Sequence, residues 1–408
     1  MGETARGPLV IDQEYFEDPH SVHARLREES AATRIVLPRG LRVWLVTRYE
    51  EARFALADPR FAKDHAKTNE LAVRHWTGEG DPVMFDQSLV RHMLNTDPPN
   101  HTRLRKLVTK AFTPKRVEAL RPRIQEITDE LLDAAAGRGE VDLVEALAFP
   151  LPITVICELL NVPLDQRDDF RRWSNILVAG NQPELMHEAG AAMAGFLAGL
   201  VADKRANPGD DFFSALVHAT EDDDRLDEVE LISMAFLLLV AGHETTVNLI
   251  ANGVFNLLRH PDQLEKLRAD RSLLPGAIEE FLRYEGPVNQ ATFRYTTEDV
   301  QVGDVLIPEG HFVLVSLVAA NRDGARFPDA DSFDITRPAG GHLAFGHGVH
   351  YCLGAPLARL EGEIAVGSLL DRFDVALAAE PETLRWREST LMRGLYSLPV
   401  SLSDRGAH

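Results

Sequence analysis

The chain has 408 residues and carries 63 acidic against 43 basic side chains, which gives a formal net charge of −20. Such an acidic surface repels phosphate, so it excludes a nucleic-acid binder and disfavours attachment to an anionic membrane surface. The hydrophobic content of 45% is that of a globular protein with a large core, and it excludes disorder as the main theme.

Only two cysteines are present, Cys157 and Cys352, so a disulfide framework and a Cys-rich zinc module are both excluded. The N-terminal residues 1–17 are polar and show neither a signal peptide nor a membrane anchor. We therefore expect a cytoplasmic protein in a reducing compartment, with no membrane and no nucleic acid as partner.

Periodicity and turn residues predict the elements in chain order. A helix near 19–29 is followed by a hairpin, and a long helical region comes before two further β-rich parts. The expected pieces of a single domain (1–408) are a first β-rich part near 34–47, helices over 113–206, a second small sheet within 299–318 and final strands near 391–402.

One long helix is predicted over residues 231–258, where Glu244 is the only acidic or basic side chain. A segment that is apolar on nearly all sides is buried in a protein core or spans a membrane. Asn248, Asn252 and Asn256 recur at four-residue spacing, and a charge at the centre is costly in lipid. The pattern favours a buried central helix.

Residues 345–354 contain the densest cluster of unusual residues. Three glycines let the backbone approach a flat ligand, and Cys352 precedes a helix that begins near 355. Amide N–H groups at a helix start lower the pKa of a thiol, so the position favours a thiolate. Two alternatives stay open, namely an inert buried cysteine and a zinc site formed with His347 and His350.

This segment resembles the haem-binding signature F-G-x-G-x-H-x-C-x-G of the cytochrome P-450 family at every fixed position. The resemblance implies a mainly α fold, helix-rich with small β-sheet regions and a long buried central helix. It also implies haem b as cofactor, with Cys352 as the axial ligand of the iron and His350 at a propionate. Phe345 and Gly354 are the further haem contacts that it carries over.

The predicted buried helix carries a second signature, residues 241–246, which is similar to the family's A-G-x-[DE]-T-[TS]. An acid followed by an alcohol in an apolar helix is expensive unless the pair handles protons. The resemblance makes Thr245 the alcohol that hydrogen-bonds dioxygen and Glu244 part of a proton relay, with Ala241 and Gly242 beside the haem. The alternative is a buried pair that bonds the backbone at a local helix distortion.

Two further matches concern structure and haem retention. Glu280 and Arg283 fit the family's E-x-x-R, and the resemblance adds Arg337 to form a buried structural network. His101, Arg105 and Arg294 correspond to family ligands of the haem propionates, although each alone could be a solvated cation.

A basic patch is expected on the surface near this segment, from Arg103, Lys106 and Lys110. On an acidic protein it could dock an acidic ferredoxin, and a solvated face is the alternative.

The expected activity is a haem-thiolate monooxygenation, in which O2 and two electrons from a separate ferredoxin and ferredoxin reductase hydroxylate or epoxidise a large hydrophobic molecule. The resemblance is strongest to actinobacterial enzymes of antibiotic biosynthesis, so a macrolide or other polyketide is the expected substrate and a monomer the expected state. A steroid, terpenoid, peptide or xenobiotic is the alternative substrate. A haem-binding sensor or carrier is the alternative function.

The predicted pocket is apolar and rich in methionine, which suits a large ligand. Asp81 and Asp86 lie in the same early loop and could meet an amino sugar. The expected lining residues are Met84, Phe85, Leu89, Val90, Met93, Leu177, Val178, Leu237, Val240, Ala241, Val288, Ala291, Thr292, Leu391 and Met392.

Overall fold

The computed structural model describes residues 9–79, 87–163, 166–179, 183–221 and 224–405. Within these ranges the chain is mainly helical, as expected. The α-helices are α1 (Gln13–Glu17), α2 (Pro19–Glu29), α3 (Tyr49–Ala57), α4 (His65–His75), α5 (Gln87–Val90), α6 (Asn100–Ala111), α7 (Pro114–Glu118), α8 (Arg121–Ala135), α9 (Pro150–Leu159), α10 (Arg167–Ala179), α11 (Pro183–Ala206), α12 (Phe212–Val217), α13 (Glu228–Arg259), α14 (Pro261–Ala269), α15 (Leu274–Tyr284), α16 (Leu317–Asn321) and α17 (Ala355–Arg372).

The strands form small sheets, and the largest has six strands in the order β1-β2-β3-β11-β8-β4. Strand β11 pairs in parallel with β3, whereas β2 and β3 form the expected antiparallel hairpin. The strands are β1 (Leu9–Val10), β2 (Ala32–Val36), β3 (Arg42–Val46), β4 (Phe61–Ala62), β5 (Glu140–Asp142), β6 (Thr220–Glu221), β7 (Asp224–Arg225), β8 (Arg294–Thr296), β9 (Val300–Val302), β10 (Val305–Ile307), β11 (Phe312–Val315), β12 (Phe373–Leu377) and β13 (Pro399–Asp404).

The second small sheet expected within 299–318 is present, but only part of that segment forms it. Strands β9 and β10 pair only with each other, but β11 joins the N-terminal sheet between β3 and β8. The run of β11 is buried at all four positions, which lets it occupy a central place in that sheet. Short-range patterning finds a strand but does not identify a partner more than 250 residues away.

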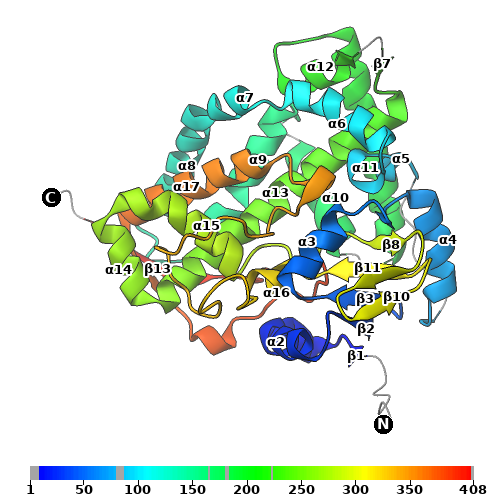
Figure 1. Cartoon of the computed structure of the whole chain (residues 1–408). Helices are drawn as coiled ribbons and strands as arrows, with labels where there is room; N and C mark the ends of the chain where they lie inside the picture. Colours follow the sequence, from blue (N-terminus) through cyan, green and yellow to red (C-terminus); the bar gives the residue numbers. More distant parts are fainter. Residues whose placement is uncertain (1–8, 80–86, 164–165, 180–182, 222–223, 406–408) are drawn as a thin grey trace.

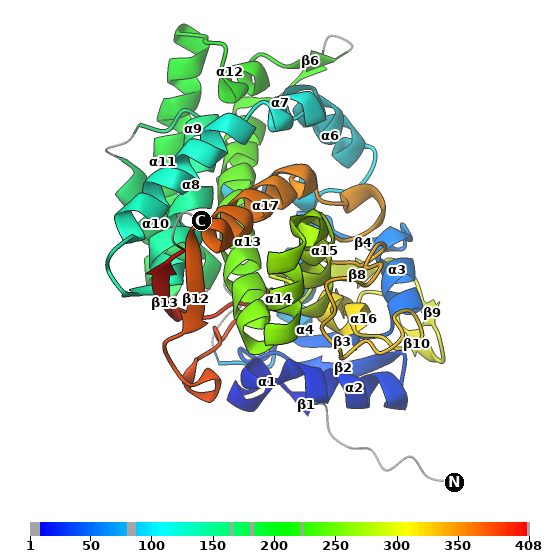
Figure 2. The same cartoon turned by 90° about the vertical axis from the view of Figure 1, so that its left-hand side faces the viewer.

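Helix α13 forms the centre of the helical part, and it extends the predicted 231–258 by three residues at its start and one at its end. Asp227 caps it in a reciprocal capping box with Glu230, and Pro261 follows its end. The helix packs against α5, α9, α11, α15 and α17. Figure 2 shows it running through the middle of this layer.

Helices α11 and α13 are both apolar and long enough to cross a membrane by length and composition alone. The apolar window of α13 is 67% buried inside the protein, as in the core helix of a globular fold.

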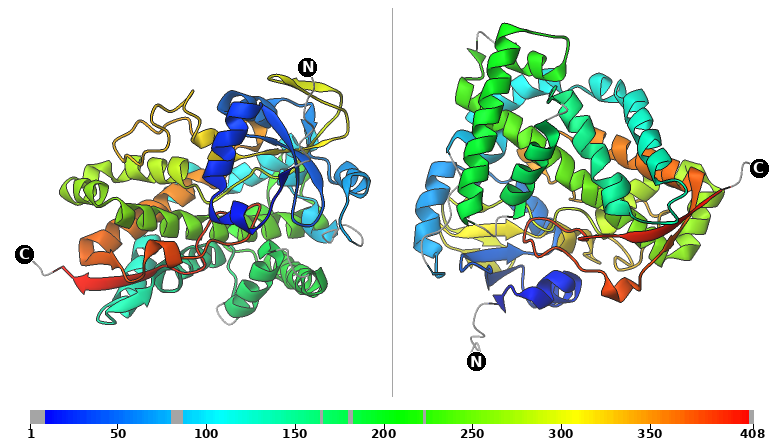
Figure 3. Two further views of the ribbon diagram at one scale, coloured as in Figure 1. Left: turned by 90° about the horizontal axis from the view of Figure 1, so that it is seen from below. Right: turned by 180° about the vertical axis from the view of Figure 1, so that it is seen from behind.

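The sheet and α2 lie on one side of the molecule, and the helices around α13 and α17 lie on the other (Figure 1). The final strand β13 pairs with β12 and β5 at the opposite side from β1 (Figure 3). The segment between β12 and β13 returns along α13, which brings C-terminal residues to the central helix.

Candidate active site

The loop that carries Cys352 is folded tightly between the end of the sheet region and α17. The Cys352 N–H donates to the Phe345 carbonyl at 2.9 Å, which closes the loop into a narrow turn. Gly348 has φ +73°, and an added Cβ would lie 3.0 Å from the backbone of Ala57 in α3, so only glycine fits there. The thiol therefore sits at a fixed place just before the first turn of α17.

Ion pairs fasten both flanks of this loop to α15. The Glu279 carboxylate accepts from Arg359 at 2.5 Å and lies 3.1 Å from His342 Nε2. Although burial acts in the opposite direction, the hydrogen bonds from these two partners hold the pKa of Glu279 at about 2. The Arg359 guanidinium also lies over the Phe345 ring, 4.6 Å from its centroid.

The expected low pKa of the Cys352 thiol was wrong for the protein alone. Cys352 is accessible, but it lies deep among protein atoms, and this burial raises the pKa of its thiol. The N–H groups of Gly354 and Ala355 and the charge of Arg105 act in the opposite direction, as the helix-start argument requires. A nearby metal cation would add to these groups in favouring the thiolate.

A cluster of basic side chains lies beside this loop. The rings of His101 and His350 are 4.3 Å apart between centroids, and Arg294 and Lys63 are both buried nearby. Burial, and then the charges of Lys63 and His101, lower the pKa of His350 to about 2. Burial also lowers the pKa of Arg294 to about 10. The cause of these shifts is that several basic side chains lie together in a desolvated place, where each disfavours the charged form of the others.

The cluster fits an anionic group, and this is a test of the haem that the resemblance implies. His101 is 2% exposed, yet neither of its ring nitrogens has a hydrogen-bond partner. Among the described residues, Asp97 is the acid whose negative charge favours the charged forms of Lys63, Arg294 and His101. Several buried basic side chains with one carboxylate suit a ligand that brings two more carboxylates, as the propionates of haem do, because these would favour the charged forms of the basic groups.

Lys63 was missed by the sequence analysis. It is 4% exposed, it follows the short strand β4, and its ammonium group donates to Thr292 Oγ1 at 2.5 Å. Burial, and then Arg294, hold the pKa of Lys63 well below its usual value. No short-range motif marks it, because the partners that define its place lie on segments 34 and 229 residues away.

Helix α13 presents a narrow accessible face at its centre. Ala241 is exposed and Gly242 and Thr245 are partly exposed, whereas the neighbours His243, Glu244, Thr246 and Val247 are buried. The Thr245 hydroxyl donates to the Ala241 carbonyl at 2.9 Å. Ala241 and Thr245 thus lie on an accessible face with a hydroxyl at its edge, whereas an added Cβ at Gly242 would lie 3.1 Å from Ile156 of α9.

Glu244 points away from that face, toward the C-terminal segment. Its carboxylate is 3% exposed and accepts from Arg387 Nη1 at 2.5 Å. His243 Nε2 lies 3.8 Å from the other carboxylate oxygen, and burial lowers the pKa of this histidine. Sequence reasoning found the acid but not Arg387, which lies 143 residues further along the chain.

Glu280 and Arg283 form a bidentate pair with both contacts at 2.7 Å, and both side chains are 0% exposed. Arg283 donates as well to the carbonyls of Asn321, Ala330 and Ser332. Arg337 Nε lies 3.6 Å from Glu280. The three residues come together as the sequence comparison implied, and they brace the segment that leads to the Cys352 loop.

The predicted pocket residues come from several elements. Leu89, Val90, Met93, Leu177, Leu237 and Met392 are buried, Val240, Val288, Ala291 and Thr292 are partly exposed, and Ala241 and Leu391 are exposed. Val288 and Met392 form a β-bridge that joins two of the expected walls. Met84, Phe85, Asp81 and Asp86 lie outside the described residues, and the side chain of Val178 is not described.

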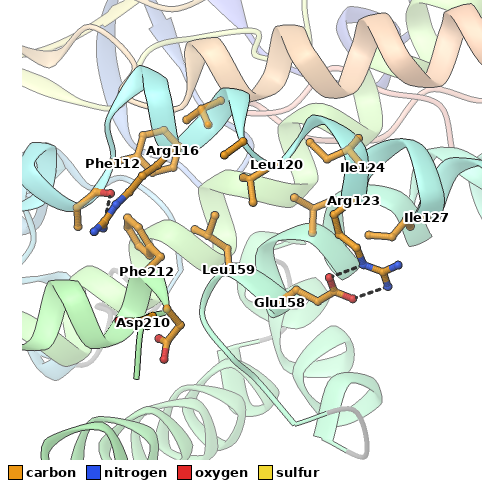
Figure 4. Close-up of a pocket in the computed structure, with 15 residues that line it drawn as sticks. Phe112, Arg116, Leu120, Arg123, Ile124, Ile127, Glu158, Leu159, Asp210 and Phe212 are labelled. Atoms are coloured by element: carbon orange, nitrogen blue, oxygen red, sulfur yellow. Dashed lines mark hydrogen bonds and ion pairs between the residues drawn. The ribbon is translucent and has the colours of Figure 1, made fainter. Parts of the chain in front are cut away.

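A cavity of about 360 Å³ lies apart from all these residues, among α6 to α9 and the start of α12. Its floor is apolar, with Phe112, Leu120 and Leu159, and the ion pair of Arg123 with Glu158 lies at its edge (Figure 4). None of the predicted site residues lines it, so it is not the expected substrate pocket.

One residue of the expected basic patch, Arg103, is neutralised by carboxylates. Arg103 pairs with Asp224 and Glu230, and Lys110 donates to the Thr220 carbonyl, whereas Lys106 is exposed. In the described part of the chain there is no group of three His, Cys, Asp or Glu residues that could hold a metal, so the zinc alternative finds no support.

Comparison with known proteins gives consistent matches. A sequence model described as Cytochrome P450 matches residues 153–399. The chain is 60% identical over 393 residues to Cytochrome P450 107B1 of Saccharopolyspora erythraea, covering 96% of this chain and 97% of that protein. It is 51% identical over 409 residues to the monooxygenase PikC of Streptomyces venezuelae, covering 98% and 96%. The structure of the P450 monooxygenase TamI bound to tirandamycin C matches with a TM-score of 0.90 and 54% identity, covering 97% and 100%.

Proposed function

Because the chain belongs to the cytochrome P450 family, we propose that this haem-dependent monooxygenase hydroxylates or epoxidises a large apolar molecule of the macrolide or polyketide class. The observation that carries the proposal is that the accessible thiol of Cys352 lies beside the buried cluster of basic side chains. Asp97 supplies the carboxylate that acts on this cluster. This arrangement suits a planar group that brings a metal to the sulfur and two carboxylates to the cations.

Haem b, the cofactor of this family, supplies the activation of O2 and the insertion of one oxygen atom into the substrate. The chain's own residues bind and orient it. Cys352 would provide the sulfur ligand, and His101, Arg105, Arg294, His350 and Lys63 would hold the propionates. Phe345, Gly354, Ala241 and Gly242 would contact its faces.

Proton handling falls to the pair at the centre of α13. Thr245 places a hydroxyl at the accessible face, and Glu244 holds a carboxylate one residue away on the buried side. A carrier or sensor has no use for a buried acid beside an alcohol, because such a group costs stability unless it moves protons. This pair therefore favours turnover over storage.

The substrate class rests on the relatives and on the pocket. One relative, 44% identical over 401 residues, is a 6-deoxyerythronolide B hydroxylase, and another, 42% identical over 395 residues, is a mycinamicin IV hydroxylase/epoxidase. A third is named for polyketide biosynthesis. The apolar walls, with Met93 and Met392, suit large ligands that make few fixed polar contacts.

Electrons would come from a separate ferredoxin and its reductase in the cytoplasm. Lys106 and Lys115 are exposed on α6 and α7, close in sequence to Arg105, which faces Cys352. A small positive area on a protein of charge −20 attracts an acidic partner by complementarity. Replacing Lys106 and Lys115 by Gln should weaken reduction most at low ionic strength, because salt screens exposed charges.

The test is a titration of the purified ferric protein with 6-deoxyerythronolide B, mycinamicin IV, tirandamycin C and vitamin D3, followed by turnover with a plant-type ferredoxin and reductase. We expect a spin-state change and an oxygenated product with at least one of the first three. Vitamin D3 serves as the contrasting probe, because a relative 47% identical over 395 residues is named as its 25-hydroxylase. Oxidation of vitamin D3 alone would overturn the substrate class.

A further inference from the structure

Residues 384–398, the C-terminal strap, fold back on themselves and lie along α13 (Figure 3). Trp386 forms an antiparallel β-bridge with Leu395, and the Arg387 N–H donates to the Gly394 carbonyl at 2.9 Å. These contacts join the first half of the strap to the second. Met392, at the turn, forms the bridge to Val288 described above. The strap therefore carries a predicted substrate contact at its tip and Arg387 on its arm.

One face of α13 seats the strap. Glu244, Asn248 and Asn252 are spaced by four residues and so share that face. Asn252 Nδ2 donates to the Arg393 carbonyl at 2.9 Å. Gly394 lies so close to Asn248 that an added Cβ would be 1.9 Å from its Oδ1. The asparagine row noted in the sequence thus serves as the seat of the strap, and Glu244 stands at its end.

Arg387 is the cation that faces Glu244. His243 Nδ1 lies 2.8 Å from the Leu239 carbonyl, so this nitrogen carries the proton, and the neutral ring offers only a lone pair at Nε2. That lone pair faces Ser174 and Glu244 and cannot donate to the carboxylate. Arg171 of α10, also near His243, is itself paired with Glu145. Arg387 therefore holds the buried carboxylate.

The two members of this pair differ in exposure. The Glu244 side chain is 3% exposed, whereas that of Arg387 is 27% exposed. Water can thus reach the guanidinium, which contacts the carboxylate of Glu244, the residue that precedes Thr245 in α13. A relay acid needs such a connection, because it must recover each proton that it gives.

We propose that Arg387 is a positioning residue for the proton-handling role of Glu244, and that the strap couples this role to the substrate pocket at Met392. Glu244 takes one proton from water beside the guanidinium and releases one proton toward Thr245, which regenerates the carboxylate that Arg387 holds. A ligand that presses on Met392 moves the strap, and the strap carries Arg387. This inference rests on the proposed monooxygenase function.

The experiment compares Arg387→Met and Arg387→Lys in the haem-loaded full chain, reduced through a plant-type ferredoxin and reductase. The first readout is the solvent deuterium isotope effect on NADPH oxidation without any added substrate. We expect Arg387→Met to raise this effect about twofold or more, because proton delivery becomes slow, and Arg387→Lys to restore it. Product formed per NADPH with tirandamycin C should fall about tenfold in Arg387→Met.

Arg385→Met is the matched control, since Arg385 lies on the same strap but pairs with the exposed Glu388. It should leave both readouts and the binding constant for tirandamycin C unchanged. Gly394→Ala gives a second route to the same defect, because it shifts the strap away from Asn248, and Arg387 with it, while the arginine side chain itself is kept. An unchanged isotope effect in Arg387→Met, or no rescue by lysine, would overturn the proposal.

The substrate-free isotope effect keeps this test separate from the proposed substrate class. Suppose that 6-deoxyerythronolide B, mycinamicin IV and tirandamycin C all fail to bind, but the isotope effect rises in Arg387→Met. The proposed substrate class is then wrong, and the role of Arg387 stands. If tirandamycin C is turned over normally by Arg387→Met with an unchanged isotope effect, the monooxygenase function stands and the role of Arg387 fails.

Discussion

Two acid–arginine pairs lie next to the central helix, and they differ in a way that separates structure from chemistry. Glu280 and Arg283 are both fully buried, and the arginine spends its remaining donors on three backbone carbonyls. Glu244 is nearly as buried as Glu280, but its partner Arg387 is 27% exposed and lies on a separate segment. The first pair is closed, because neither side chain is exposed to water, whereas the second pair is open to water through its arginine.

A third acid sharpens the contrast. Glu361 of α17 is 0% exposed, and neither of its carboxylate oxygens has a hydrogen-bond partner. Burial, opposed by Thr246, raises the pKa of Glu361 to about 8. Among the described residues, Glu361 is thus a buried acid that no arginine pairs with, unlike Glu244 and Glu280.

Breaking the closed pair should have the largest effect on stability. Glu280→Ala leaves the buried Arg283 without its counter-charge, which costs about 3 to 5 kcal/mol in the free energy of unfolding. Unfolding in guanidinium chloride measures this loss. The double variant Glu280→Leu with Arg283→Met should be less destabilised than Glu280→Ala alone, and a loss below about 1 kcal/mol in the single variant would contradict the closed pair.

Glu361→Gln should change the pH dependence of stability. Because the folded pKa of about 8 lies above the usual value, the wild-type protein loses stability as the pH rises from about 4.5 to 8. The variant should lack this decline, so its stability relative to wild type should rise by roughly 4 kcal/mol between pH 5 and pH 8.5. Melting curves across this range check it, and parallel pH profiles for the two proteins would count against a neutral Glu361.

Glu244→Gln should damage turnover more than folding. The amide keeps the shape and still accepts from Arg387, but it cannot pass a proton, so product per NADPH should fall about tenfold, or about 1.4 kcal/mol. Peroxide should appear in place of product. The free energy of unfolding serves as the control and should change by about 1 kcal/mol or less. If this variant formed as much product per NADPH as wild type, Glu244 would have no part in proton delivery.

The smallest effect is expected at Arg385. Its pair with Glu388 is exposed on both sides, with side-chain exposures of 63% and 45%. Arg385→Met should change the melting temperature and the coupling by no more than the error of measurement. If Arg385→Met lowered the product formed per NADPH as much as Arg387→Met does, any charge on the strap would matter. The pair of Glu244 and Arg387 would then have no special role.

The sequence predicted the parts of the site that are written in short motifs. Cys352, Glu244, Thr245 and the Glu280–Arg283 pair each stand within a few residues of the pattern that marks them. Lys63 and Arg387 could not be found this way, because their partners come from distant segments that meet only in the fold. The same reason explains β11, whose place in the sheet depends on β3 and β8.

The lowered thiol pKa expected at Cys352 failed for a related cause. The helix-start amides were foreseen from the neighbouring glycine and alanine, but the burial that outweighs them depends on the packing around the loop. Neighbours in the sequence reveal the N–H groups that lower the pKa of a thiol. The burial that raises this pKa depends on the whole fold and cannot be predicted from those neighbours.

The central claim is that Cys352 binds the iron of haem through its sulfur. Reduction with dithionite under carbon monoxide, in the full-length protein and in Cys352→His, tests it most directly. A thiolate ligand moves the Soret band of the wild-type complex far to the red, and the histidine variant should lose that shift while still binding haem. A wild-type spectrum without the shift, or a variant that keeps it, would contradict the account.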